Sequence, residues 1–194
     1  TMTRNTNKVL NELSYAADAT STGFSDLGIG MSYVGSTAHQ AGLSLAETAS
    51  AMGILSNNGL EADKAGTGLR QVINSLVKAV GNIDKKNSLL RKLGIEKSEL
   101  VDANGNLKDL STVMGVIEKH TEGKDPTEKG ALFNKLFGTT GQQAGLILAE
   151  NSRQLDKLTS KVEGATKKDY IGKLAEQNLK SAQNQLRIFK EQLT

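Results

Sequence analysis

The sequence predicts an all-α protein. Over most of the 194 residues, apolar side chains recur three and four positions apart, which is the period of one helix face. Helix start and stop signals punctuate this pattern, and a single stretch carries a hairpin signal. We therefore expect a compact array of short packed helices with one small hairpin-like element near residues 100–107, followed by a long C-terminal amphipathic helix.

The first helix should begin very close to Thr1, because Val9, Leu13 and Ala16 already form an apolar stripe. We expect residues 1–25 to hold the end of a preceding helix and a linker rich in Ser and Thr. A second helix follows Ser25 and is expected to end at Gly42.

The third helix has a defined start, since residues 44–47 read S-L-A-E. In this capping box the Ser44 hydroxyl and the Glu47 carboxylate satisfy each other's backbone N–H groups. An Asn-Asn-Gly run predicts a left-handed cap at Gly59, and a fourth helix should start near Glu61.

The third and fourth helices each carry a small residue four positions before a glycine. Glycine inside a helix costs about 1 kcal/mol relative to alanine, so close packing is the simplest reason for it. The same spacing occurs in membrane helix dimers, but charged residues surround these faces and disfavour that reading. The helix-packing candidates are Ala49, Gly53, Ala62, Gly66 and Leu69.

Asn104-Gly105 between short apolar runs is a strong signal for a tight hairpin. Helical spacing then returns, and Asp125 followed by Pro126 predicts the capped start of another helix. That helix should stop at Gly138, with a further helix after it.

A long polar helix is expected near the C-terminus, with a seam spaced four and three residues apart in heptad fashion. The coiled-coil seam candidates are Ala175, Leu179, Ala182, Leu186, Phe189 and Leu193. We expect residues 26–151 to form a core module, and residues 152–194 to be a helical extension entering a longer region of coiled-coil type.

Composition excludes several classes of site. The chain has no cysteine, which rules out disulfides and thiolate chemistry. A net charge of +3 without a basic cluster gives no reason to expect specific nucleic-acid binding. No stretch has the roughly 18 unbroken apolar residues that indicate a membrane span.

Motifs for chemistry are likewise missing. His39 and His120 stand outside any zinc-hydrolase pattern and are expected on helix surfaces. Oxygen side chains at alternate positions, from Asp102 to Asn106, suggest a calcium loop, but Leu107 stands where that loop needs glycine. We expect a polar turn there, and no catalytic residue, cofactor or metal site in the chain.

Four segments nevertheless resemble one family, the core region of tail tape measure proteins of long-tailed bacteriophages and prophages. They are residues 26–42 (DLGIGMSYVGSTAHQAG), 43–76 (LSLAETASAMGILSNNGLEADKAGTGLRQVINSL), 93–110 (LGIEKSELVDANGNLKDL) and 136–151 (LFGTTGQQAGLILAEN). Together they span about two-thirds of the chain, in the family's order.

The resemblance implies a structural role: a tape measure that sets tail length during assembly, lies in the tail tube lumen of the virion and leaves on genome ejection. It implies contacts with tail tube subunits, tail assembly chaperones and tail tip or baseplate proteins, first in the host cytoplasm, and association with itself through helices. It adds no catalytic residue. Two alternatives stay open: a membrane-active helical module in transient contact with the host membrane, and a domain associated with a cell-wall hydrolase.

Overall fold

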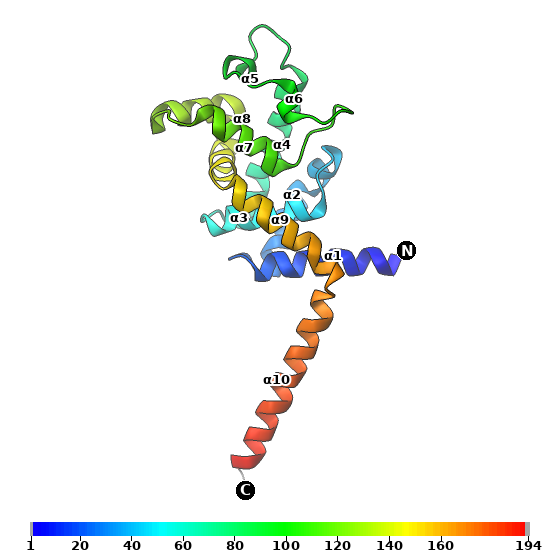
Figure 1. Cartoon of the computed structure of the whole chain (residues 1–194). Coiled ribbons are helices and arrows are strands. Elements are labelled where there is room, and N and C mark those ends of the chain that lie inside the picture. Colours follow the sequence, from blue (N-terminus) through cyan, green and yellow to red (C-terminus); the bar gives the residue numbers. More distant parts are fainter. Residues whose placement is uncertain (1, 193–194) are drawn as a thin grey trace.

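Helices account for most of the chain, as the spacing predicted (Figure 1). The computed structural model describes residues 2–192, and for residues 2, 3, 186 and 189–192 it describes the backbone alone. The described helices are α1 (Met2–Asp18), α2 (Phe24–Gln40), α3 (Leu45–Asn57), α4 (Ala62–Gly81), α5 (Leu89–Lys92), α6 (Lys97–Leu100), α7 (Leu110–Thr121), α8 (Pro126–Glu150), α9 (Ser152–Lys167) and α10 (Tyr170–Gln192).

The predicted helix starts are confirmed. The Ser44 hydroxyl accepts from Glu47 N at 3.1 Å, and the Glu47 carboxylate accepts from Ser44 N at 2.8 Å. The second carboxylate oxygen of Glu47 accepts from Leu110 N at 3.0 Å, so one side chain caps α3 and also binds the start of α7. Asp125 caps α8 ahead of Pro126, and the left-handed backbone at Gly59 ends α3 as expected.

Helix α8 is bent back on itself at Gly138, the predicted stop. Gly138 has φ 70° and ψ 175°, which breaks the helix within a single residue. The two halves lie side by side, because Gln142 on the second half donates to the Gly130 carbonyl at 3.1 Å and accepts from Asn134 at 2.9 Å. This makes α8 a helical hairpin rather than a rod.

A partly buried lysine ties this hairpin to α7. Lys129 Nζ lies 2.9 Å from a Glu118 oxygen on α7 and 3.3 Å from a Glu150 oxygen at the end of α8. Burial alone lowers the pKa of an ammonium, but the hydrogen bonds and charges of the two carboxylates outweigh it, so the pKa of Lys129 is raised. The side chain therefore stays charged and bridges three helical segments.

The hydrophobic core centres on α3 and α4, with α4 packed between α2 and the α8 hairpin. The core also takes in helices from both ends of the chain: Ala16 of α1 is fully buried, as are Leu155 and Val162 of α9. Packing thus runs past both expected boundaries of the 26–151 module. The prediction that residues 26–151 form a module of their own stays a prediction.

The hairpin-like element near residues 100–107 is confirmed, and it is the single bridge seen within residues 2–192. Val101 and Leu107 form an isolated antiparallel bridge. The Asp102 carboxylate closes the turn by accepting from Asn104 N at 2.8 Å and from Asn106 N at 2.9 Å. These bonds lower the pKa of Asp102, and they explain the alternating polar residues as turn chemistry.

Candidate assembly surfaces

The exposed stripe of α10 is the first candidate surface. Helix α10 leaves the body of packed helices and extends away from it (Figure 1). Of the predicted seam, Ala175 and Ala182 are exposed, and Leu179 is 61% exposed. The side chains of Leu186 and Phe189, and all of Leu193, lie outside the described residues. No described residue of this chain covers the described part of the stripe.

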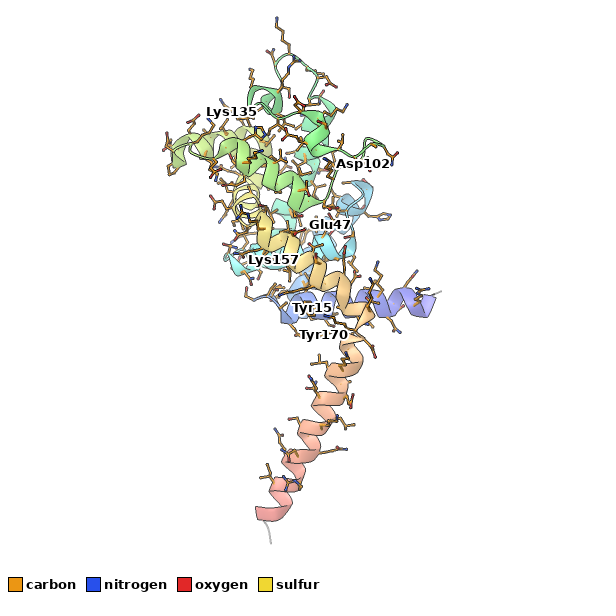
Figure 2. The ribbon with its side chains drawn as sticks, viewed as in Figure 1. Tyr15, Glu47, Asp102, Lys135, Lys157 and Tyr170 are labelled. Carbon is orange, nitrogen blue, oxygen red and sulfur yellow. The ribbon has the colours of Figure 1, made fainter. Side chains whose placement is uncertain are left out.

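The root of α10 is held by aromatic and acidic side chains of α1. The Tyr170 hydroxyl donates to a carboxylate oxygen of Asp18 at 2.7 Å. The rings of Tyr15 and Tyr170 meet edge to face, with centroids 5.1 Å apart (Figure 2). The hydrogen bond to Asp18, together with burial, raises the pKa of Tyr170 to about 12. Tyr170 therefore remains a hydrogen-bond donor at all physiological pH values.

A third side chain of α1, that of Asn11, completes this anchor. The side-chain oxygen of Asn11 accepts from the backbone N–H of Ile171 at 2.9 Å, although the residues are 160 positions apart. The Asn11 amide nitrogen donates to the Asn7 carbonyl at 2.8 Å, which fixes its orientation. Asn11 is buried, so the first turn of α10 is capped from within the body.

Beside Asn11 lies a buried carboxylate. Glu12 is only 2% exposed, Lys8 Nζ lies 3.8 Å from one of its oxygens, and the other oxygen has no partner among the described side chains. Burial raises the pKa of Glu12, the Lys8 charge opposes this, and Glu163 of α9 adds to it. A charged Glu12 carboxylate at the junction of α1 and α9 therefore lowers the stability of the fold.

The predicted packing residues of α4 lie at its crossing with α2. A methyl group added at Gly66 would lie 2.5 Å from the Gly30 carbonyl oxygen and 3.0 Å from Tyr33 Cβ. The Ala62 carbonyl would lie 3.1 Å from a Cβ added at Gly30, and Leu69 is fully buried one turn further on. The crossing brings α4 to α2, a partner that the spacing of small residues did not identify.

The predicted residues of α3 lie elsewhere. Ala49 is fully buried, and a Cβ at Gly53 would lie 2.6 Å from Thr20 Cγ2, in the segment that joins α1 to α2. The structure therefore does not bring the pairs Ala49–Gly53 and Ala62–Gly66 together at one contact. Gly53 packs against Thr20, whereas Gly66 packs against Gly30 of α2.

Sequence reasoning missed a closer contact inside the α8 hairpin. A Cβ at Gly145 would collide with the Phe137 ring, and one at Gly141 would lie 3.0 Å from Gln71 Cγ and 3.1 Å from Phe137 Cβ. The buried Phe137 ring thus occupies the space that a side chain at 145 would need. The sequence does carry the same signal that was used for α3 and α4, because Gly141 and Gly145 are small residues four positions apart.

The histidines differ in environment. His39 is exposed as expected, but His120 is half-buried: its ring nitrogens lie 3.1 Å from the Leu93 carbonyl oxygen and 3.3 Å from a Glu99 oxygen. The expectation of a surface residue is wrong for His120, since it links α7 to the segment around α6. Among the described residues, no group of three His, Cys, Asp or Glu side chains is placed to hold a metal ion.

A groove of about 1030 Å³ runs between α7 and the corner where α8 meets α9. Its lining carries both charges, from Glu118, Glu122, Asp156, Lys119 and Arg153.

In the described part of the chain, no helix combines the length and apolar character of a membrane span.

Residues 1–138 match the family model described as phage-related minor tail protein. The chain belongs to this family. Among proteins of this kind, it is 32% identical over 146 residues to a tape measure protein of Pneumococcus phage Dp-1, an alignment covering 75% of this chain and 12% of that protein. It is 28% identical over 152 residues to a probable tape measure protein of Escherichia phage P2, covering 76% of this chain and 18% of that protein.

The chain therefore spans less than a fifth of the length of these two relatives, and no solved structure matches it. The resemblance stated from the sequence is confirmed, and three of its four segments lie wholly within the matched residues. In this chain, each segment contains a structural feature that shapes the fold. Residues 26–76 supply the α2–α4 crossing and the capping box, residues 93–110 the hairpin, and residues 136–151 the bend of α8.

Proposed function

We propose that this chain is a region of a tail tape measure protein, a virion structural protein that sets tail length and lies in the tail tube lumen until the genome is ejected. The support is the family membership together with the two relatives, which are a tape measure protein and a probable tape measure protein. The segment acts through shape and contact, without catalysis. Its partners are tail tube subunits, tail assembly chaperones and tail tip or baseplate proteins.

The contrast between body and rod suggests how a ruler could work here. A helix advances about 1.5 Å per residue, so an extended helix converts residue number into length. Residues packed into the body cannot do this, because their helices fold back on each other. We therefore assign the measuring role to α10 and the compact body to fixed contacts with other tail proteins.

Insertions in the phage-encoded protein test this division. One, two or three extra copies of residues 175–188 are placed after residue 188, each adding about 21 Å at 1.5 Å per residue while keeping the heptad phase. A control places a Gly/Ser insert of equal length in the exposed turn at Asn104-Gly105. Electron microscopy of the tails should show stepwise lengthening for insertions in α10 and none for the control.

Two results would count against the proposal. Tails of unchanged length after insertion in α10 would contradict the measuring role, and equal lengthening by both inserts would contradict the division between body and rod.

Placement is tested separately with a photo-crosslinking residue at Leu179 in assembled tails. Crosslinks to the tube subunit, or to a second copy through the seam, support a place in the lumen, whereas their absence opposes it.

A further inference from the structure

The bend between α9 and α10 is confined to two residues, Lys168 and Asp169. Neither is proline or glycine, and Lys168 has near-helical angles of φ −93° and ψ 0°. Asp169 has φ 46°, in the left-handed region, which Gly enters freely, Asn and Asp enter occasionally, and Ala disfavours. Rotation at Lys168 and Asp169 thus separates the bent arrangement from one continuous helix running from α9 into α10.

The hydrogen bonds around the bend show what replaces the missing turn. Lys168 N still donates to the Gly164 carbonyl at 3.3 Å, and Lys173 N donates to the Asp169 carbonyl at 3.1 Å. Between them, Ile171 N would donate to the Lys167 carbonyl in a continuous helix. In the bent form the Asn11 side chain takes that place, at 2.9 Å.

All the side-chain contacts already described at the α10 root come from α1: Asn11 on the Ile171 N–H, Asp18 on the Tyr170 hydroxyl, and Tyr15 on the Tyr170 ring. Gly172 leaves room for the Asp169 carboxylate, which would have to rotate away from a Cβ at this position. The bend therefore depends on α1 and on two residues of its own, with no proline to make it permanent.

We propose that α1 and the start of α10 form a two-position joint. With α1 in place, Asn11, Asp18 and Tyr15 hold α10 at an angle to α9. Without this grip, α9 and α10 join into one helix, and the rod points in a different direction. The position of the N-terminal helix thereby controls the direction of the C-terminal rod, 152 residues further along the chain.

Distance measurements between two spin labels test the joint directly. The chain has no cysteine, so Lys157→Cys on α9 and Ser181→Cys on α10, both exposed, give a single labelled pair (Figure 2 marks Lys157). In a continuous helix the 24 residues between them span about 36 Å. Any bend makes the distance shorter, so we expect a value below this limit in the otherwise unchanged chain.

Two substitutions at the bend form a matched pair that leaves α1 untouched. Asp169→Gly removes the penalty for positive φ and should keep the short distance. Asp169→Ala disfavours positive φ and should shift the distribution toward about 36 Å.

The grip is tested with Asn11→Ala combined with Tyr170→Phe, which should also lengthen or broaden the distance. Circular dichroism on each labelled protein checks that helix content is retained. An unchanged short distance in the folded Asp169→Ala protein would overturn the joint. A shift in that protein but not in the Asn11→Ala, Tyr170→Phe protein would overturn the control by α1.

Discussion

Substituting alanine for Gly66 tests the claim that α2 and α4 pack backbone to backbone. The added Cβ would lie 2.5 Å from the Gly30 carbonyl oxygen, where ordinary contact begins at 3.4 Å. The obstacle is main chain, so no rotamer change relieves it, and one helix must move by about 0.9 Å. A buried neighbour resists this movement, because Leu69 packs one turn away in the core.

The magnitude follows from two opposing effects. Alanine is favoured over glycine inside a helix by about 1 kcal/mol. Overpacking a closed contact costs about 1–3 kcal/mol, and a backbone obstacle belongs at the upper end of that range. We expect Gly66→Ala to lower the free energy of unfolding by about 2 kcal/mol, which at this chain length lowers Tm by about 4–8 °C.

The matched control is Gly35→Ala in α2, where an added Cβ meets nothing within 4 Å. This substitution should raise the free energy of unfolding by about 0.5–1 kcal/mol through helix propensity alone. Thermal and urea unfolding followed by circular dichroism measure both variants. If the two shift stability in the same direction, or if Gly66→Ala matches the unsubstituted chain, the close crossing is not as described.

Three further outcomes are expected. Gly145→Ala should lower the free energy of unfolding by about 2 kcal/mol in the same assay, because its methyl group meets the buried Phe137 ring; wild-type stability would contradict the tight α8 hairpin. Asp125→Ala should cost about 1 kcal/mol, since the carboxylate accepts from two backbone N–H groups at the start of α8; a loss below the error of a urea titration would contradict the cap. Glu12→Gln should raise Tm at neutral pH. Because burial raises the pKa of Glu12, the folded protein is more stable with Glu12 protonated, and this stability is lost as the pH rises above 4.5 and through the folded-state pKa. Glutamine stays uncharged and avoids the loss. Tm measured against pH should show this gap closing in acid, and equal Tm values at neutral pH would oppose it.

Signals that act within a few residues were predictable from the sequence. The capping box at Ser44, the cap at Asp125 and the stop at Gly138 each depend on neighbours in the chain, so their chemistry can be read directly. The hairpin near residues 100–107 belongs to the same class, since Asp102 and Gly105 close it locally. The fold class followed from these signals and the helical spacing.

Contacts between distant segments were not predictable. Nothing near Glu47 indicates that its second oxygen binds Leu110 N, 63 residues away, and nothing near Asn11 indicates that it caps α10. Spacing of small residues identified Gly66 as a place of close approach but could not say which helix would approach it. Helix α9 was predicted to belong to the extension outside the core module, because Leu155 and Val162 form only a narrow apolar stripe among charged residues. In the structure both are buried.

This difference between local and distant contacts bears on how length could be encoded. Residues 2–167 would reach about 250 Å as one helix, but the bend at Gly138, the glycine crossings and the shared core fold them into one body. The 23 residues of α10 advance about 35 Å along a single axis. Adding residues to the body changes its loops and packing, whereas adding whole heptads to α10 changes length in proportion. Under the proposed function, we therefore expect the linear relation between residue number and tail length within residues 2–192 to come from α10, with the body contributing a constant.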